Sequence, residues 1–359
     1  MRIRTIVPVI AVLLILAGAT PVLAQVDTAA ALAYLGSQQN ADGGFGSGFS
    51  PDSTIASTAD TVLAIVAAGA DPTTFDQDGN TPRTYLAANA LSAASGGDLS
   101  KLILAAVALG ENPREFGGVD SVAKLESLTG ADGRIGSETD TFVSHTLAVL
   151  ALASAQRPIP DSSVAHIEAA QQEAGGWAWD GSAATAADTN TTAFAVQALI
   201  AAGEAAGSDA VTLALAYYSE IQNDDGGWPY QNPSDFGTDT DANSTAVTIQ
   251  AIIAAGQDPA GAGWATEEGN TPVAALAALQ NESGAFAWQA AMPDDNLLAT
   301  VQALPAVAGK AFPLATMDVG EAAPATMPQT GGPAANLALP LLLGGLALAG
   351  GGYVLRRSK

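Results

Sequence analysis

The feature that most constrains this chain is a two-helix unit that recurs along it. In its clearest copy, from Tyr217 to Gly256, one helix ends near Gln222, a Gly-Gly-Trp turn follows, and a second helix opens at Asp241. Related turns follow Gln39, Leu128, Gln172 and Gln280. A repeat of about 45 residues is typical of architectures in which each helix pair buries its apolar face against its neighbours.

Each part of the turn has a physical role. A glutamine near a helix end can hydrogen-bond backbone groups that the helix leaves unpaired. The glycines allow a positive φ in the reversal, and the aromatic residue after them packs back on the helix end. The second helix of each pair, such as the one near Asn243-Ser244-Thr245-Ala246, is rich in alanine and apolar nearly all round. That pattern predicts a buried helix.

The sequence predicts an all-α fold of twelve helices in six pairs. Neither end of the series has a clear polar capping pair, which an open solenoid requires, so we predict closure into an α6/α6 toroid over residues 25–309. The expected pairs are 27–39 with 54–69, 82–95 with 99–110, 119–128 with 140–155, 161–173 with 188–205, 209–222 with 242–255, and 271–280 with 295–307.

Both ends of the chain are predicted to be targeting segments. Residues 1–24 have a basic start, an apolar core and a small-residue cleavage site at Val22-Leu23-Ala24, as in a signal peptide. Residues 334–354 form an apolar run long enough to cross a bilayer, and the basic tail 355–359 is predicted to stay inside the cell. The folded part is therefore expected to be exported.

The segment 310–333 is rich in Pro, Ala and Thr and is predicted to be a stalk. Its end, Met327-Pro328-Gln329-Thr330-Gly331, resembles a sortase cell-wall sorting signal with Met in place of the usual Leu. The resemblance implies cleavage between Thr330 and Gly331 and attachment to the cell wall. A plain membrane anchor is the alternative, and both place the toroid at the cell surface.

Charge and cysteine content exclude several function classes. The chain has 36 acidic and 12 basic residues, a net charge of -24, and no basic residue between Asp161 and Gly309. Such a body repels nucleic acid and anionic lipid. There is no cysteine, so disulfides, thioesters and Cys metal ligands are excluded.

At the Gln–Gly–aromatic turns the chain resembles the terpenoid cyclase and protein prenyltransferase superfamily, whose members contain prenyltransferase/squalene oxidase repeats. The turns at Gln172, Gln222 and Gln280 look like that family's glutamine–tryptophan motifs without their usual opening basic residue. The resemblance covers about residues 27–308 and implies an inner ring of six helices inside an outer ring.

The resemblance does not carry the family's known chemistry to this chain. Cyclases of the squalene–hopene type use an Asp-x-Asp-Asp-Thr-Ala motif, and the matching stretch here begins at Asp241, with Asn243 in the place of the proton donor. A neutral amide is not a strong general acid. The zinc site of prenyltransferases needs Asp, Cys and His. This chain has no cysteine, and its two histidines are His145 and His166. No cofactor is expected.

Acidic and amide residues at the predicted starts of inner helices are the candidate ligand-binding groups. They are expected to surround one mouth of the toroid, although Asp, Asn, Ser and Thr are also ordinary helix caps. Asp239-Thr240-Asp241-Ala242-Asn243 has oxygen ligands at alternate positions, which leaves calcium as an alternative, but it lacks the Gly and Glu of a calcium loop. The candidates are Asp188, Asn190, Asp239, Asp241, Asn243, Asp294, Asp295 and, as a stacking platform, Trp228.

These observations predict a surface-anchored, non-catalytic toroid for adhesion or ligand capture. The expected ligand is extracellular: a polysaccharide, a peptide or an apolar small molecule. The alternative is an enzyme, either terpene cyclase-like or glycoside-active, that uses carboxylates in the cavity. Buried, coupled carboxylates with perturbed pKa values would indicate the enzyme.

Overall fold

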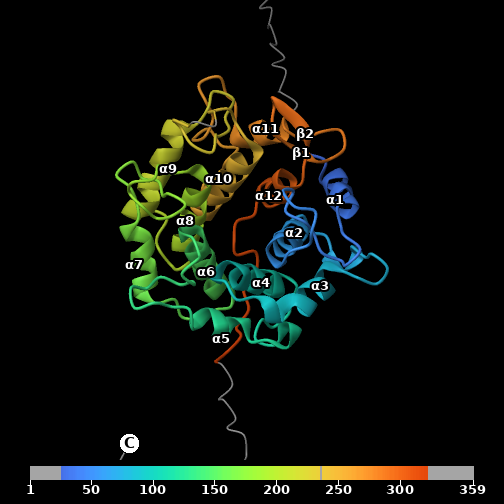
Figure 1. The fold of residues 1–359 in the computed structure, drawn as a ribbon. Coiled ribbons are helices and arrows are strands. Elements are labelled where there is room, and N and C mark those ends of the chain that lie inside the picture. Colours follow the sequence, from blue (N-terminus) through green and yellow to red (C-terminus); the bar gives the residue numbers. More distant parts are fainter. Residues whose placement is uncertain (1–25, 235–236, 322–359) are drawn as a thin grey trace, which may run out of the picture. The chain divides into compact units, whose positions relative to one another are not determined.

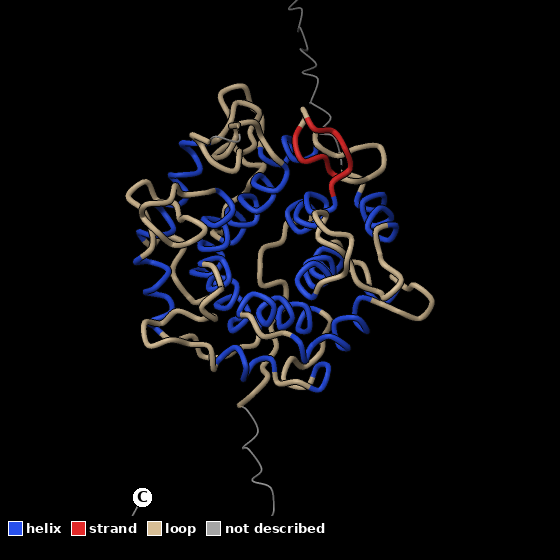
Figure 2. Tube along the Cα trace, viewed as in Figure 1, coloured by secondary structure: helices blue, strands red, loops and turns tan. Residues whose placement is uncertain are grey.

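The computed structural model describes residues 26–234 and 237–321, whose helices form an inner and an outer ring (Figures 1 and 2). The inner ring consists of α2 (Ile55–Ala67), α4 (Gly96–Ala108), α6 (Phe142–Ser154), α8 (Thr189–Ala201), α10 (Ala242–Ala254) and α12 (Leu297–Val307). The outer ring consists of α1 (Thr28–Ser37), α3 (Pro82–Asn89), α5 (Ser121–Glu126), α7 (Asp161–Ala169), α9 (Asp209–Ile221) and α11 (Pro272–Ala277).

The inner ring is closed. Each inner helix packs against the next one along the chain, and α12 packs against α2. This confirms the predicted toroid, and the twelve predicted helices are all present, the outer ones shorter than expected. Three short 3₁₀ turns lie between the helices, at Pro72–Thr74, Ala90–Ser92 and Phe116–Gly118.

One element was not predicted. Strands β1 (Phe286–Gln289) and β2 (Met292–Asn296) form an antiparallel hairpin in the connection from α11 to α12. The Pro and the two Asp residues of β2 are unfavourable for a strand. The pairing of Phe286 with Asn296 forms because the turn holds β1 in place beside the start of α12.

The glutamine of the turn joins neighbouring repeats. The side-chain amide of Gln222 donates to the carbonyl of Gly226 in its own turn at 2.8 Å and to that of Trp264, ahead of the next outer helix, at 3.0 Å. The equivalent amide of Gln280 donates to Gly284 and to Asp27, at the start of α1. The last repeat is thus hydrogen-bonded to the first. Gln39 and Gln171 make the corresponding bonds.

A side chain of the inner helix accepts a hydrogen bond from the backbone N–H of the large apolar residue in the turn. Thr245 Oγ1 accepts from the backbone N–H of Trp228, and Thr58, Thr192 and Thr300 do the same in their repeats. In the third repeat His145 replaces the threonine, and its Nδ1 accepts from the N–H of Ile135. Burial lowers the pKa of His145 to about 4, so the neutral ring is the form that accepts. His145 is therefore a structural residue.

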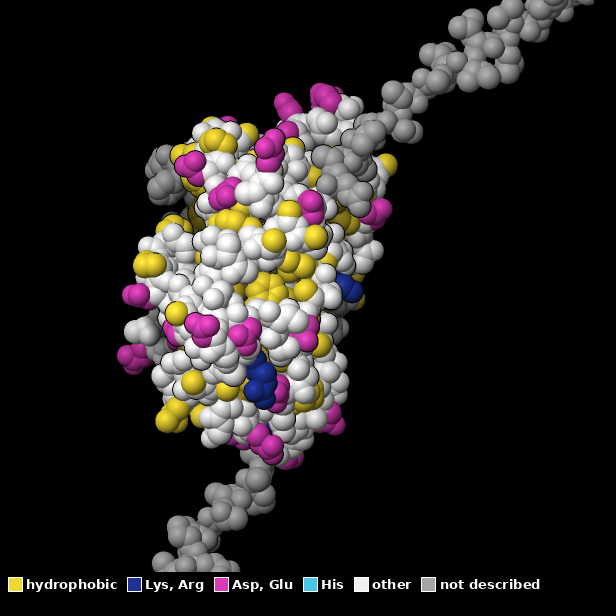
Figure 3. Space-filling view, turned by 90° about the vertical axis from the view of Figure 1, so that its right-hand side faces the viewer, with side chains coloured by type: hydrophobic (Ala, Val, Ile, Leu, Met, Phe, Trp, Pro, Cys, Tyr) yellow, Lys and Arg dark blue, Asp and Glu magenta, His cyan; other side chains and the backbone are white. Residues whose placement is uncertain are grey.

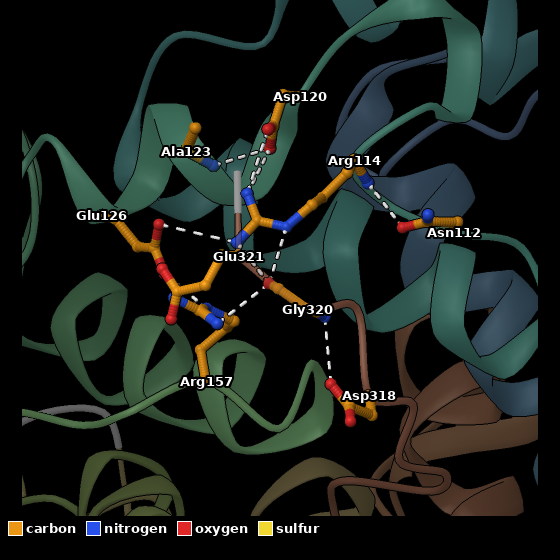
Figure 4. Close-up of polar contacts among 9 residues, drawn as sticks. All are labelled: Asn112, Arg114, Asp120, Ala123, Glu126, Arg157, Asp318, Gly320 and Glu321. Atoms are coloured by element: carbon orange, nitrogen blue, oxygen red, sulfur yellow. Dashed lines mark hydrogen bonds and ion pairs between the residues drawn. The ribbon is translucent and has the colours of Figure 1, made fainter. Parts of the chain in front are cut away.

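The chain after α12 returns across the C-terminal ends of inner helices. The N–H of Phe312 donates to Gln197 Oε1, and Ser154, the last residue of α6, bonds the backbone of Ala315 and Met317. Figure 4 shows the side chains of Arg114 and Arg157, which both donate to the carbonyl of Gly320.

This packing changes the expected domain boundary. The described part of the predicted stalk, 310–321, lies on the toroid, so the compact unit extends past 309. The rest of the predicted stalk, the sorting motif with Thr330 and Gly331, the apolar run and the signal segment lie outside the described residues. Among the helices that are described, none has the length and apolar character needed to cross a membrane.

Candidate active site in the lumen

The inner helices surround a cavity of about 120 Å³, the lumen, on the axis of the toroid. Each inner helix contributes residues to its wall, spaced by three or four along α2, α4, α6 and α10, so the same helical face points inward in each. Phe312 of the returning segment also lines the cavity. The lining residues are Asp60, Leu63, Lys101, Leu104, Val143, Leu147, Phe194, Val247, Gln250, Val301, Gln302, Pro305 and Phe312.

The wall of the lumen is apolar except for one ion pair and two amides. Lys101 Nζ on α4 lies 2.6 Å from Asp60 Oδ2 on α2, and the side chains are 24 % and 31 % exposed. A charged pair on an otherwise apolar wall is unusual, because charged side chains are seldom placed in apolar surroundings. Neither residue is among the candidates from the sequence. The signal was present: Asp60 is the only charged residue in α2.

The ion pair lies where the lumen joins a second cavity. The second cavity, which we call the mouth, has a volume of about 310 Å³. It is lined by residues of the loop Gly46–Phe49, by the first turn of α2 and by Leu297 and Leu298 of α12. Asp60, Lys101 and Val301 line both cavities. A small molecule that enters through the mouth therefore passes the ion pair before it reaches the lumen.

The amide groups lie on the other side of the lumen. In the ring of six inner helices, α10 is three places from α4, so Gln250 lies on the wall opposite Lys101. Gln250 Nε2 donates to the backbone carbonyl of Gln302 at 3.2 Å, and Asn243 Nδ2 donates to Gln302 Oε1 at 2.7 Å. Asn243, a candidate from the sequence, therefore holds the side-chain amide of Gln302 in place and does not serve as an acid.

Two predicted candidates, Asp188 and Asp241, are buried N-caps. The carboxylate of Asp241 accepts from the backbone N–H and the hydroxyl of Ser244, at 2.7 and 2.8 Å. Asp188 makes the same two bonds to Thr191. Burial raises the pKa of each to about 6, although these hydrogen bonds oppose the shift. They stabilise the starts of α8 and α10 and line none of the cavities described above.

The remaining candidates do not converge on one site. Asp239, Asp294 and Asp295 are exposed. Asn190, in the first turn of α8, has a buried side-chain oxygen without a hydrogen-bond partner among the described residues. Within those residues no three His, Asp or Glu side chains gather as metal ligands. Calcium binding stays an alternative from the sequence.

The stacking role expected for Trp228 is wrong, because its side chain has no exposed surface. Its ring packs in the core, and Nε1–H donates to the carbonyl of Tyr218 at 2.8 Å. Trp179 is an exposed tryptophan, 49 % accessible, beside a groove of about 490 Å³ that Asp140 and Asp180 also line. Hydrogen bonds hold the pKa of both carboxyls below its usual range. Neither is suited to be the protonated acid of a glycosidase.

Acidic side chains are dispersed over the outer surface. In Figure 3 they are scattered across the face, with few Lys or Arg between them and with hydrophobic side chains in small groups. This distribution fits a hydrated outer surface.

We predict that replacing Asp241 with Asn makes the protein's stability less dependent on pH. The pKa of the Asp241 carboxyl is about 6 in the folded state. In the unfolded chain the pKa of an Asp carboxyl is about 4. Its contribution to stability is therefore complete at low pH and is lost as pH rises through about 6. The Asn variant lacks this loss. Relative to wild type, its free energy of unfolding should rise by about 3 kcal/mol between pH 4 and pH 7.5.

Urea unfolding at a series of pH values measures this difference. Asp239→Asn is the matched control, since Asp239 is exposed, and its curve should run parallel to that of wild type. His145 titrates in all three proteins and cancels in the comparison. A difference between Asp241→Asn and wild type that stays constant with pH would contradict the assignment of a raised pKa.

The sequence and fold were compared with known proteins. A family model described as the prenyltransferase alpha-alpha toroid domain matches residues 2–102 and 138–292, more than half of the chain. No protein of curated function was found to match the sequence.

Solved structures with the same fold include several enzymes. The type II terpene cyclase MstE from Scytonema is 14 % identical, with a TM-score of 0.56 over 78 % of this chain and 96 % of that one. A variant of it, solved with geranylgeranyl dihydroxybenzoate, is 13 % identical with a TM-score of 0.54 over 79 % and 95 %. A glycosidase is 12 % identical, with a TM-score of 0.50 over 78 % and 94 %.

These neighbours correct the function predicted from the sequence. A non-catalytic module for binding or display was expected, and the toroids that share this fold are named as terpene cyclases and a glycosidase. The prediction is therefore wrong, and the findings favour its alternative, an enzyme. The charged residues that line the lumen, Asp60 and Lys101, lie outside the motif positions from which the family's chemistry is recognised in the sequence.

Proposed function

The chain belongs to the prenyltransferase alpha-alpha toroid family, and on that premise we propose that it is an enzyme acting on a small, hydrocarbon-rich molecule in the lumen. The observation that carries the proposal is the Asp60–Lys101 pair at the junction of lumen and mouth. Partly exposed ion pairs add little stability, so stability alone is a weak reason for this one. An apolar cavity with a few convergent polar groups is the usual form of a small-molecule site.

The pair supports proton-transfer chemistry. The carboxylate of Asp60 acts as the general base and removes a proton from a carbon that a carbonyl group of the substrate activates, while the ammonium group of Lys101 stabilises the enolate oxygen on which the negative charge develops. Return of the proton at another position completes an isomerisation and restores Asp60. All atoms balance, and the step needs no oxidant or second substrate. Leu63, Leu104 and Leu147 on the surrounding wall would hold the hydrocarbon part and exclude water.

Two other reactions fit the site less well. The cyclase position is occupied by Asn243, which is hydrogen-bonded to Gln302 and has no acidic proton. Glycoside hydrolysis needs two carboxyl groups about 5–10 Å apart, and Asp60 is the one carboxylate that lines the lumen among the described residues. Proton transfer by a single carboxylate beside a cation requires neither.

The test uses the full chain in D₂O with citral and related C10 unsaturated aldehydes, whose carbonyl group activates the neighbouring C–H bonds, followed by mass spectrometry. We expect deuterium incorporation or double-bond isomerisation, lowered at least about 100-fold in Asp60→Asn. Asp52→Asn, in an exposed loop, is the matched control and should retain the wild-type rate. Circular dichroism checks that both variants fold. A rate for Asp60→Asn equal to that of wild type would refute the role of the ion pair.

We also propose that the toroid is exported and held at the cell surface. The support is the sequence: the signal-like segment 1–24, the sorting-like motif that ends at Gly331, and the apolar run 334–354. If the motif is cleaved after Thr330, Thr330→Ala should shift the protein from the cell-wall fraction to the membrane or the medium. Thr326→Ala, just outside the motif, is the control. Equal wall fractions for both variants would rule out sorting by this motif.

A further inference from the structure

One buried acceptor in the lumen has no hydrogen-bond partner. The side chain of Gln250 is 1 % exposed and lines the cavity, and its Oε1 contacts no donor among the described residues. An unpaired buried polar atom costs about 1–3 kcal/mol, so such atoms are uncommon in folded proteins. Because Gln250 lines the lumen, we infer that a hydrogen-bond donor of a bound molecule pairs with its Oε1.

The orientation of the amide follows from its neighbour. The other end of the Gln250 side chain, Nε2, donates to the backbone carbonyl oxygen of Gln302 at 3.2 Å. A carbonyl oxygen only accepts, so the amide cannot be turned round without bringing two oxygens together. Oε1 is thus the free end, and it requires a donor.

We propose that the lumen binds an alcohol whose hydroxyl group donates to Gln250 Oε1. A hydroxyl brings one donor, which matches one free acceptor. An ammonium ligand would bring three donors into a cavity whose wall is mainly apolar and that already contains the cation of Lys101. The hydrocarbon part of the alcohol then lies against Val247 and Pro305, and Phe312 limits how far it extends.

This inference rests on the proposed function and names its substrate class. Because Gln250 is on the wall opposite Lys101, an alcohol held there by its hydroxyl group spans the lumen toward the ion pair. The group that reacts is then at the end of the molecule away from the hydroxyl. Gln250 is a positioning residue in this scheme, since it binds the substrate without taking part in proton transfer.

The test compares the binding of geraniol and its methyl ether, which has the same chain but no donor. By isothermal titration calorimetry, wild type should bind geraniol about tenfold or more tightly than the ether. Gln250→Met keeps the bulk of the side chain and removes the acceptor, so it should bind both about equally. Gln77→Met, in the loop before α3, is the matched control and should retain the preference.

The outcomes separate this inference from the proposed function. Binding is measured with Asp60→Asn as well as wild type, so no turnover is needed. A preference for geraniol that disappears in Gln250→Met supports the inference even if no reaction is detected. The inference is overturned if Gln250→Met keeps the preference, if wild type shows none, or if wild type binds neither compound, in which case Gln250 meets only water.

Discussion

Replacing Trp228 with Ala should lower the free energy of unfolding by at least about 4 kcal/mol. The ring is fully buried and packs edge-on against Tyr218 and Trp264, with centroids 6.0 and 5.9 Å away. Removing a buried aromatic side chain costs about 3–5 kcal/mol, because the surrounding structure fills the cavity only in part. The carbonyl of Tyr218 also loses its hydrogen bond from Nε1. The total is a large share of the stability of a typical domain.

Urea unfolding followed by circular dichroism measures this effect. The matched control is Trp179→Ala, whose side chain is 49 % exposed and which should change stability by about 0.5 kcal/mol or less. If Trp228→Ala does not fold at all, Trp228→Phe keeps most of the ring and should lose an intermediate amount. Equal effects of Trp228→Ala and Trp179→Ala would contradict the packing role of the repeated turn.

Replacing Gly284 with Ala should lower the free energy of unfolding by about 3–5 kcal/mol and loosen the closure of the ring. Gly284 has φ +90, and a Cβ added there would overlap the backbone of Ala30 in α1. The left-handed conformation costs a residue with a Cβ about 1–2 kcal/mol, and overpacking adds about 1–3 kcal/mol. The nearby bonds from Gln280 to Gly284 and Asp27 would be disturbed too.

The control for this variant separates strain from overlap. Gly256 has φ +73 and nothing within 4 Å of an added Cβ, so Gly256→Ala should cost only about 1–2 kcal/mol. Hydrogen exchange gives a second measurement, since the amides of α1 should exchange faster in Gly284→Ala and not in Gly256→Ala. Similar stability and exchange in the two variants would show that the contact with α1 does not close the ring.

The repeated turn shows how far local sequence carries a fold prediction. The side-chain amide of Gln222 donates to the carbonyls of Gly226 and Trp264. The glutamine and the turn glycines, with their spacing, are visible in the sequence. The partner in the neighbouring repeat is not visible, but any such pair must stack on another. The hairpin of β1 and β2 was missed because its pairing depends on where the turn places β1, while the residues of β2 disfavour a strand.

The candidate site was predicted less well. Asp and Asn at the predicted helix starts are the candidates from the sequence, but the carboxylates of Asp188 and Asp241 cap their own helices. The polar groups of the lumen, Asp60, Lys101 and Gln250, come from α2, α4 and α10. Their common feature is the face of the helix that they occupy, and a sequence alone does not say which face of a buried helix meets a cavity.

The two-helix unit, its turn chemistry and the acidic, cysteine-free composition were determined by the sequence, because hydrogen bonds within a turn and helical periodicity depend on residues close together in the chain. Tertiary structure decided that α12 packs against α2 and that residues up to Glu321 lie on the toroid. It also brought Asp60 and Lys101 to one wall and Gln250 to the opposite one. Those contacts join residues far apart in sequence, and only the closed ring gives them a common axis.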